Sequence, residues 1–260
     1  MSDRALQDDV IRALADARYR ASPEWRGRGL ADAERVERFA RFLARHFYHE
    51  RIVHFFKYSR ALARVTGRQP EAVLTRPGFE ALLPTLVLGG RDAARAVAAL
   101  VVEHVGSAQP AAPIPYLRDL LRYEETMMVV EAGPRVWRDA PKEGDTGVER
   151  GAVDLPEKVE GTVLLSLEHD LPVVLPKLLR PWSDVPPAPA RDTKLLVARS
   201  AHGRVAVARS NQAVAALVEL ADGRRTLDQL AARTGLAKQE VESALRGLVE
   251  LGAVRFSTGS

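Results

Sequence analysis

Residues 193–260 constrain the fold most, because strand, turn and helix-stop signals follow one another there without a gap. Lys194–Arg199 and Arg204–Ala208 are short apolar runs on either side of His202-Gly203, a pattern that predicts a β-hairpin. Val254–Phe256 is β-prone and is expected to return as a further strand.

Three helices are expected between the hairpin and that strand. We expect Ser210 to cap the first. Thr226 and Gln229 have the spacing of a capping box, which begins a second helix over Leu227–Thr234. The third has apolar residues at i, i+4, i+7 and i+8, namely Val241, Leu245, Leu248 and Val249. Strands and helices in this order predict a winged-helix-like domain over residues 193–260.

Residues 1–132 are predicted to form a helical bundle. Apolar residues recur at helical spacing over Asp3–Arg18 and over Tyr116–Glu131. A longer helix is expected from Asp32 to Thr66, with a bend or a change of face near His49. Its apolar positions, at intervals of three and four, are Val36, Phe39, Leu43 and Phe47.

Residues 133–192 are predicted as a linker that contains one short strand and one short helix. The part up to Pro156 is polar and glycine-rich, Thr162–Leu167 is β-prone, and Leu171–Leu179 has the pattern of a short apolar helix. Four prolines between Pro181 and Pro189 favour an extended connection. The whole chain is therefore predicted to be α+β, mostly α, with two domains.

Composition narrows the cellular setting and the chemistry. The chain has no cysteine, which excludes disulfides, thiolate metal sites and a cysteine nucleophile. Its first twenty residues have no apolar run, and no stretch is apolar enough for a membrane span, so we expect a cytoplasmic protein. Residues 1–66 carry fourteen Lys and Arg against nine Asp and Glu, a net of +5, which indicates either a solvated surface or an acidic partner.

The densest group of chemically active side chains is His46, Glu50 and His54. At intervals of four on a helix they share a face and can hold a metal. The order differs from the known zinc-protease motifs, and no second cluster completes a site. The sequence also lacks a Walker A loop, a G-x-S-x-G elbow and a G-x-G-x-x-G loop. We therefore expect no catalytic residues and no metal site, and a metal-dependent enzyme stays an alternative.

A winged-helix-like domain can bind DNA or a peptide. Residues 226–256 carry four basic and four acidic side chains, and the third helix begins with Glu240 and Glu242, which repel phosphate. A DNA-binding transcription regulator is therefore the alternative. An edge strand can instead accept an extended peptide, with a helix supplying apolar pockets, and periodicity does not separate this from an ordinary core strand. The candidate peptide-binding residues are Arg204, Val205, Val207, Arg209, Val241, Leu245 and Leu248.

Several short segments also resemble known families. Leu195–Arg199, the run from Leu217 to Gly223, Arg225-Thr226-Leu227 and the ending Leu248–Val254 resemble precursor-peptide recognition elements. Those small winged-helix modules hold the leader peptides of ribosomally made, post-translationally modified peptides. This resemblance covers the C-terminal domain.

The rest of the chain is similar to partner proteins of multinuclear non-heme iron-dependent oxidases. The resemblance is carried by Tyr48, Leu62–Gly67, Pro115–Leu120, Tyr123-Glu124 and Leu171–Val174. Many members of that family have an Asn soon after the tyrosine, whereas this chain has His49 and Glu50.

The resemblance implies an accessory subunit without catalysis or cofactor of its own. It would form a heterodimer with the oxidase, which holds the iron, and would recruit the precursor peptide, with no role for nucleic acid or membrane. The residues expected to dock the enzyme are His46, Tyr48, His49, His54, Tyr116, Tyr123 and Glu124.

Overall fold

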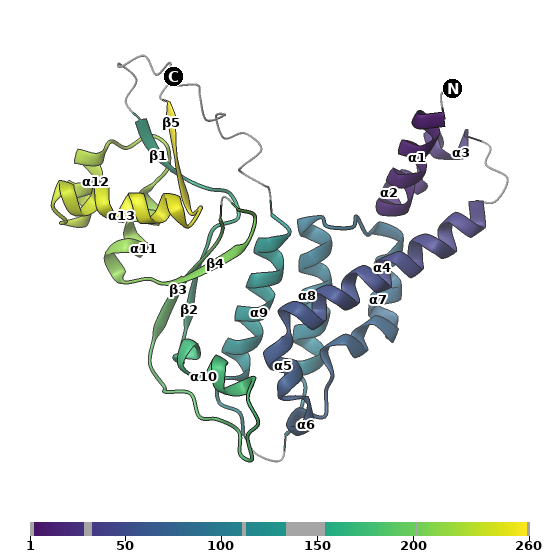
Figure 1. The fold of residues 1–260 in the computed structure, drawn as a ribbon, viewed down its shortest axis with the longest axis horizontal. Helices are drawn as coiled ribbons and strands as arrows, with labels where there is room; N and C mark the ends of the chain where they lie inside the picture. Colours follow the sequence, from purple (N-terminus) through teal and green to yellow (C-terminus); the bar gives the residue numbers. More distant parts are fainter. Residues whose placement is uncertain (1–2, 29–32, 111–112, 134–153, 201, 259–260) are drawn as a thin grey trace. The chain divides into compact units, whose positions relative to one another are not determined.

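The computed structural model describes residues 3–28, 33–110, 113–133, 154–200 and 202–258 (Figure 1). The fold is mixed α and β and mostly helical, with two small antiparallel sheets, so the predicted α+β class is confirmed. The chain forms two compact units. The N-terminal unit comprises residues 1–132 and 172–188, and the C-terminal unit comprises residues 133–171 and 189–260.

Helices make up the regular structure of the N-terminal unit (Figure 1). They are α1 (Asp3–Ala15), α2 (Ala17–Arg20), α3 (Pro23–Arg26), α4 (Ala33–Phe55), α5 (Lys57–Ala61), α6 (Ala63–Thr66), α7 (Pro77–Leu82), α8 (Arg91–Gly106), α9 (Leu117–Glu131) and most of α10 (Leu171–Leu178), with 3-10 turns at Pro70–Thr75 and Leu83–Thr85. The core between α4, α7, α8 and α9 includes Ile52, Phe56, Phe79, Val97 and Met128. None of the helices in the described part is both long and apolar enough to cross a bilayer.

The fully buried stripe of the long helix α4 lies next to the predicted one, whose Val36 and Phe47 are half-buried and pack against the core. Its buried positions fall at intervals of four, at Ala40, Ala44, Tyr48 and Ile52. Phe39, predicted to be inside, is 49% exposed. Both stripes satisfy the helical period, and the choice between them comes from packing, because small alanines let neighbouring elements approach closely.

The predicted single helix from Asp32 to Thr66 is three helices in the structure. Asp32 lies outside the described residues, and the break falls at Phe56 between α4 and α5 rather than near His49. Gly67 ends α6 in the left-handed conformation, with φ of 65°, as its position in the sequence predicts.

The C-terminal unit contains two sheets and three helices (Figure 1). Strands β2 (Val163–Leu167), β3 (Thr193–Arg199) and β4 (Val205–Arg209) form one sheet in the order β2-β3-β4, and β1 (Asp154–Lys158) pairs with β5 (Val254–Thr258) in the other. Helices α11 (Gln212–Leu220), α12 (Leu227–Thr234) and α13 (Lys238–Glu250) pack on β3 and β5 around a core that includes Leu196, Leu217, Leu230, Leu245 and Val254.

Local signals in this unit were predicted well, and the pairing of distant strands was not. The β3-β4 hairpin and the capping box of Thr226 with Gln229 are confirmed. The cap of α11 is Asn211 rather than Ser210, because Asn211 Oδ1 accepts from the Val214 N–H at 2.8 Å. The interval 133–192 is not a linker throughout, since its strands β1 and β2 belong to the C-terminal unit, although residues 134–153 lie outside the described part.

Candidate functional site

Strand β4 lies at the edge of its sheet. Its inner edge pairs with β3, and no other described strand pairs with its outer edge. The ladder is fixed at both ends, because the Ser200 N–H donates to Arg204 O at 2.8 Å and the Ser210 N–H donates to Lys194 O at 2.9 Å. Hydrogen-bonded and non-hydrogen-bonded pairs alternate along an antiparallel ladder.

This register decides which backbone groups of β4 are available. Arg204 is bonded to β3 through its carbonyl, and bonds to β3 recur at every second residue. Ala206 and Ala208 therefore direct their N–H and C=O groups toward β3. Val205, Val207 and Arg209 therefore present their N–H and C=O groups to the outer edge. An extended chain laid along that edge would meet three donors and three acceptors at strand spacing.

The side chains of β4 alternate between the two faces of the sheet. Ala206 and Ala208 lie opposite Ala198 and Leu196, which belong to the helix-covered core. Val207 lies on the other face and is 36% exposed. The small alanines on one face and the exposed Val207 on the other leave room beside the edge for the side chains of an added strand.

Asp170 anchors the end of β4. Its side chain is 1% exposed, and its carboxylate accepts from Arg209 at 2.5 Å and from Arg191. The hydrogen bond from Arg209 is the main cause that holds the pKa of Asp170 below its ordinary value, with Arg191 adding to it. The guanidinium of Arg209, predicted to bind peptide, is thus held by Asp170, so its backbone is the part that faces the free edge.

The three predicted peptide-binding residues on α13 are core residues. Val241, Leu245 and Leu248 are 0%, 0% and 2% exposed. Because their side chains fill the core under β3, they cannot line a peptide surface in this conformation. A hollow of about 320 Å³ lies instead on the outer side of α13, lined by Leu227, Glu242, Arg246, Val249 and Phe256.

Four of the seven predicted docking residues are also buried. Tyr48 is 0% exposed and packs edge-on against Phe47 and Phe79. Tyr116 and Tyr123 are buried as well, and the Tyr116 hydroxyl donates to Pro186 O at 2.9 Å. Burial raises the pKa of each of these three tyrosines to about 12. These three side chains are buried within the N-terminal unit and do not lie on its surface in this conformation.

Glu124, the fourth, is a structural cap. From α9 it accepts hydrogen bonds from the Tyr58 N–H at 2.8 Å and the Ser59 N–H at 3.2 Å, and from the Ser59 hydroxyl. Those N–H groups open α5, which has no side-chain cap of its own. Complete burial raises the pKa of Glu124 to about 8, although the hydrogen bonds from Ser59 and Tyr58 oppose the shift.

Of the three remaining docking residues, His46 and His49 share an exposed face of α4 with two aromatic rings. Phe42 is 60% exposed, and its ring stacks on Phe39 at 6.2 Å and on His46 at 6.3 Å between centroids. At 100° per residue, His49 continues this face, whereas His54 lies to one side of it. The exposed pair Phe39 and Phe42 was missed because a phenylalanine at helical spacing is usually a core residue.

In the alternative interpretation, a metal ion is held by His46, Glu50 and His54. All three side chains are exposed on α4. His49 Nδ1 lies 3.4 Å from Glu50 Oε1, a contact within the helix surface. Among the described residues, no three His, Asp or Glu side chains gather in a position to hold a metal ion.

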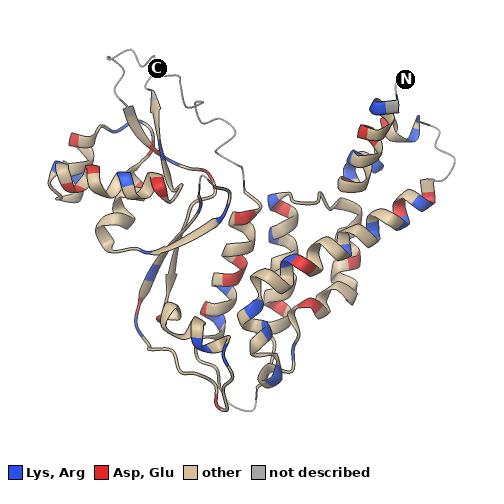
Figure 2. Cartoon of the chain, viewed as in Figure 1, with Lys and Arg blue, Asp and Glu red and all other residues tan. Residues whose placement is uncertain are grey.

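The alternative of DNA binding would use the surface of α12 and α13, where positive and negative charges are balanced. Acidic and basic side chains are interspersed along α12 and α13 (Figure 2). Lys238 Nζ lies 2.9 Å from Asp228 Oδ1, and Arg255 Nη2 lies 2.9 Å from Glu157 Oε2. Cations held by neighbouring carboxylates offer little to a phosphate backbone.

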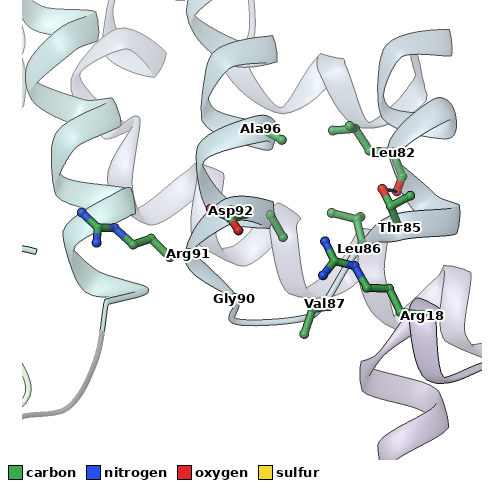
Figure 3. Close-up of a pocket in the computed structure, with 10 residues that line it drawn as sticks. Arg18, Leu82, Thr85, Leu86, Val87, Gly90, Arg91, Asp92 and Ala96 are labelled. Atoms are coloured by element: carbon green, nitrogen blue, oxygen red, sulfur yellow. Dashed lines mark hydrogen bonds between the residues drawn. The ribbon is translucent and has the colours of Figure 1, made fainter.

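A second hollow, of about 300 Å³, lies beside the first turn of α8 (Figure 3). Arg18, Leu86, Gly90 and Asp92 contribute to its lining. The Arg91 side chain extends away from the other labelled residues (Figure 3). Because Arg18 and Asp92 carry opposite charges, the hollow has no clear preference for an anion or a cation.

No protein-family model matches the sequence, and no curated protein matches it significantly.

Proposed function

We propose that this protein is a non-catalytic accessory subunit that captures a precursor peptide and presents it to a multinuclear non-heme iron-dependent oxidase. The observation that carries the proposal is the outer edge of β4, where Val205, Val207 and Arg209 offer backbone groups that no described strand pairs with. The iron belongs to the oxidase, the two proteins form a heterodimer, and the complex works in the cytoplasm. The C-terminal unit then acts as a winged-helix-like peptide recognition domain.

The peptide would join the sheet as a fourth strand beside β4. Main-chain hydrogen bonds supply affinity in strand addition, and pockets for alternate side chains supply specificity. Ala206 and Ala208 are small, which favours larger peptide side chains on the helix-covered face. Arg204 and Val205 extend the surface toward the hairpin turn, and Asp170 fixes the far end through Arg209.

The oxidase would dock on the helical bundle of the N-terminal unit, through the outer face of α4. Phe39, Phe42, His46 and His49 supply an aromatic strip on that face. Aromatic side chains that are exposed together are typical of protein interfaces, because their burial gives much of the binding free energy.

The test separates the two surfaces by substitution. Val207→Pro removes an N–H that points to the free edge and leaves the β3-β4 ladder intact, since proline is tolerated on edge strands. Val207→Ala shortens the side chain but keeps the N–H, so it is the matched control. Each variant is co-expressed with the candidate oxidase and tested for complex formation and for binding of the leader peptide.

We expect Val207→Pro to abolish peptide capture while the oxidase complex persists, and Val207→Ala to retain both. Equal peptide binding by Val207→Pro and the wild type would contradict capture on β4. So would a joint loss of both functions in a variant that stays folded by circular dichroism.

A further inference from the structure

The short helices α5 and α6 of the N-terminal unit carry basic side chains and no acidic ones (Figure 2). These are Lys57, Arg60 and Arg64, and all three are exposed. Leu62, between the two helices, keeps the right-handed helical conformation, and its N–H donates to Tyr58 O at 3.2 Å. Because the helical period continues through both helices, the three cations, at i, i+3 and i+7, share one face.

The segment that follows α10 in the same unit packs beside this face. The Arg64 guanidinium lies over the Trp182 ring, 3.5 Å from its centroid, and also donates to Trp182 O. The Trp182 Nε1–H donates in turn to Leu178 O at 3.3 Å, at the end of α10. Lys177 and Arg180, on either side of Leu178, are exposed. We call Lys57, Arg60, Arg64, Lys177 and Arg180 the cationic surface.

Few carboxylates oppose these charges. Arg60 Nε lies 3.1 Å from Glu71 Oε1, whereas the other four cations form no ion pair with a residue of the described part. In α5, α6 and residues 172–188 together, five Lys and Arg stand against a single acidic residue, Asp184. Glu124, which caps α5 from behind, is completely buried. The cationic surface therefore keeps an excess of positive charge that selects an anionic partner.

The side chains around these cations favour carboxylates over nucleic acid. Guanidinium and ammonium groups bind both carboxylates and phosphates. Proteins that bind single strands add open aromatic rings on which bases stack. Here each neighbouring ring already has a cation over it, since Lys57 Nζ lies 5.0 Å from the centroid of Tyr58 and Arg64 covers Trp182.

An exposed leucine adds an apolar contact to the cationic surface. Leu179, directly before Arg180, is 52% exposed. A phosphate backbone makes no use of such a side chain, and one leucine offers a bilayer little area to bury. An apolar contact surrounded by charged groups is instead the usual arrangement of a protein interface.

We propose that the cationic surface binds an acidic segment of a partner protein that also places an apolar side chain on Leu179. The proposal goes beyond peptide capture on β4 and does not depend on it. Lys57 and Arg64 are seven helical residues apart, about 10 Å. A partner segment with several Glu or Asp side chains over that length can meet both cations together.

The probe is the fluorescein-labelled peptide Gly-Glu-Glu-Leu-Glu-Glu-Leu-Glu-Glu-Gly, and the same peptide with Gln in place of Glu is its neutral control. Each is titrated into the full chain by fluorescence anisotropy. We expect saturable binding of the acidic peptide, tighter than about 1 mM, that weakens as NaCl is raised. Equal binding of the neutral peptide, or no binding of the acidic one, would overturn the proposal.

Charge reversal locates the probe. We expect the double variant Lys177→Glu, Arg180→Glu to weaken binding by about tenfold or more, because like charges then meet. Arg4→Glu with Arg233→Glu changes the net charge equally at exposed sites on α1 and α12, so it is the matched control and should bind as the wild type does. Circular dichroism checks that both variants are folded. Equal weakening in the two variants would mean that only the net charge matters, which would overturn the site.

Two further comparisons separate this surface from other interpretations. A single-stranded oligothymidylate, or vesicles containing phosphatidylserine, should bind more weakly than the acidic peptide, and tighter binding of either would overturn a protein partner. Val207→Pro should bind the probe as the wild type does. If that variant lost binding, the probe would lie on β4, which would overturn the cationic site and leave the proposed function standing.

Discussion

The carboxylate of Asp170 lies 2.5 Å from the guanidinium of Arg209 and so ties the last residue of the edge strand β4 to the segment that follows β2. The two residues are 39 positions apart in the sequence. Because Asp170 is buried and Arg209 is half exposed, the pair joins the interior of the C-terminal unit to the strand proposed to bind peptide.

Replacement of Asp170 should therefore loosen the end of β4. We expect Asp170→Asn to lower the free energy of unfolding by about 1.5–3 kcal/mol at neutral pH, the usual range for a hydrogen bond to a charged group. The measurement is urea unfolding followed by circular dichroism. Since the folded-state pKa of Asp170 lies below its ordinary value of 3.8, its contribution is present above that pH and is lost as the pH falls through the folded-state pKa. If Asp170→Asn lowered the free energy of unfolding equally at neutral pH and at acid pH, this role of Asp170 would be contradicted.

Glu124 should make stability fall as the pH rises. Its pKa is raised from 4.5 to about 8 by burial, so the folded protein keeps the proton over a range in which the unfolded chain has lost it. The stabilisation from protonated Glu124 is complete below the pKa of this group in the unfolded chain, and it is lost as the pH rises toward the pKa in the folded protein. We expect the free energy of unfolding of the wild type to drop between about pH 5 and about pH 8. Glu124→Gln, which does not titrate, should show a smaller drop, and equal drops would show that Glu124 is not the cause.

Tyr48 provides a test of the distinction between core and interface. Its hydroxyl is buried and has no hydrogen-bond partner among the described residues. Tyr48→Phe removes this unsatisfied group, so we expect the free energy of unfolding to stay equal or to rise by about 1 kcal/mol. Oxidase docking should be unchanged. If Tyr48→Phe were as stable as the wild type but no longer bound the oxidase, Tyr48 would be an interface residue.

The aromatic strip on α4 should matter for docking and not for folding. We expect the double variant Phe39→Ser, Phe42→Ser to change the free energy of unfolding by no more than about 0.5 kcal/mol, since both rings are exposed. It should weaken the oxidase complex by about tenfold or more, measured by surface plasmon resonance. Ile11→Ser, at a site on α1 that is 58% exposed, is the control for loss of an exposed apolar side chain. If the double variant and Ile11→Ser weakened the oxidase complex equally, the outer face of α4 would not be a specific docking site.

Local signals made much of the C-terminal unit predictable. The hairpin, the capping box at Thr226 and the stop at Gly235 each depend on a few adjacent residues, and the structure contains all three. The pairing of β1 with β5 joins residues about a hundred positions apart. Strand β1 reads Asp-Leu-Pro-Glu-Lys, with no alternation to mark it. Only tertiary contacts identify such a strand.

The candidate sites were predictable in part for the same reason. Val205 and Val207 were identified from alternation within one strand, and their register then gives them outward backbone groups. Asp170 was missed because its partners, Arg191 and Arg209, come from distant segments. Phe39 was assigned to the wrong face because its spacing fits the helical period as well as that of the buried Ala40.

Amide hydrogen exchange of the full chain with and without the leader peptide tests capture on β4 most directly. The amides of Ala206 and Ala208 are bonded to β3 and should exchange slowly in both states. We predict that the peptide slows exchange at Val205, Val207 and Arg209, whose N–H groups face the free edge. Peptide binding that leaves these three amides as fast as in the free protein would show that the peptide is held elsewhere.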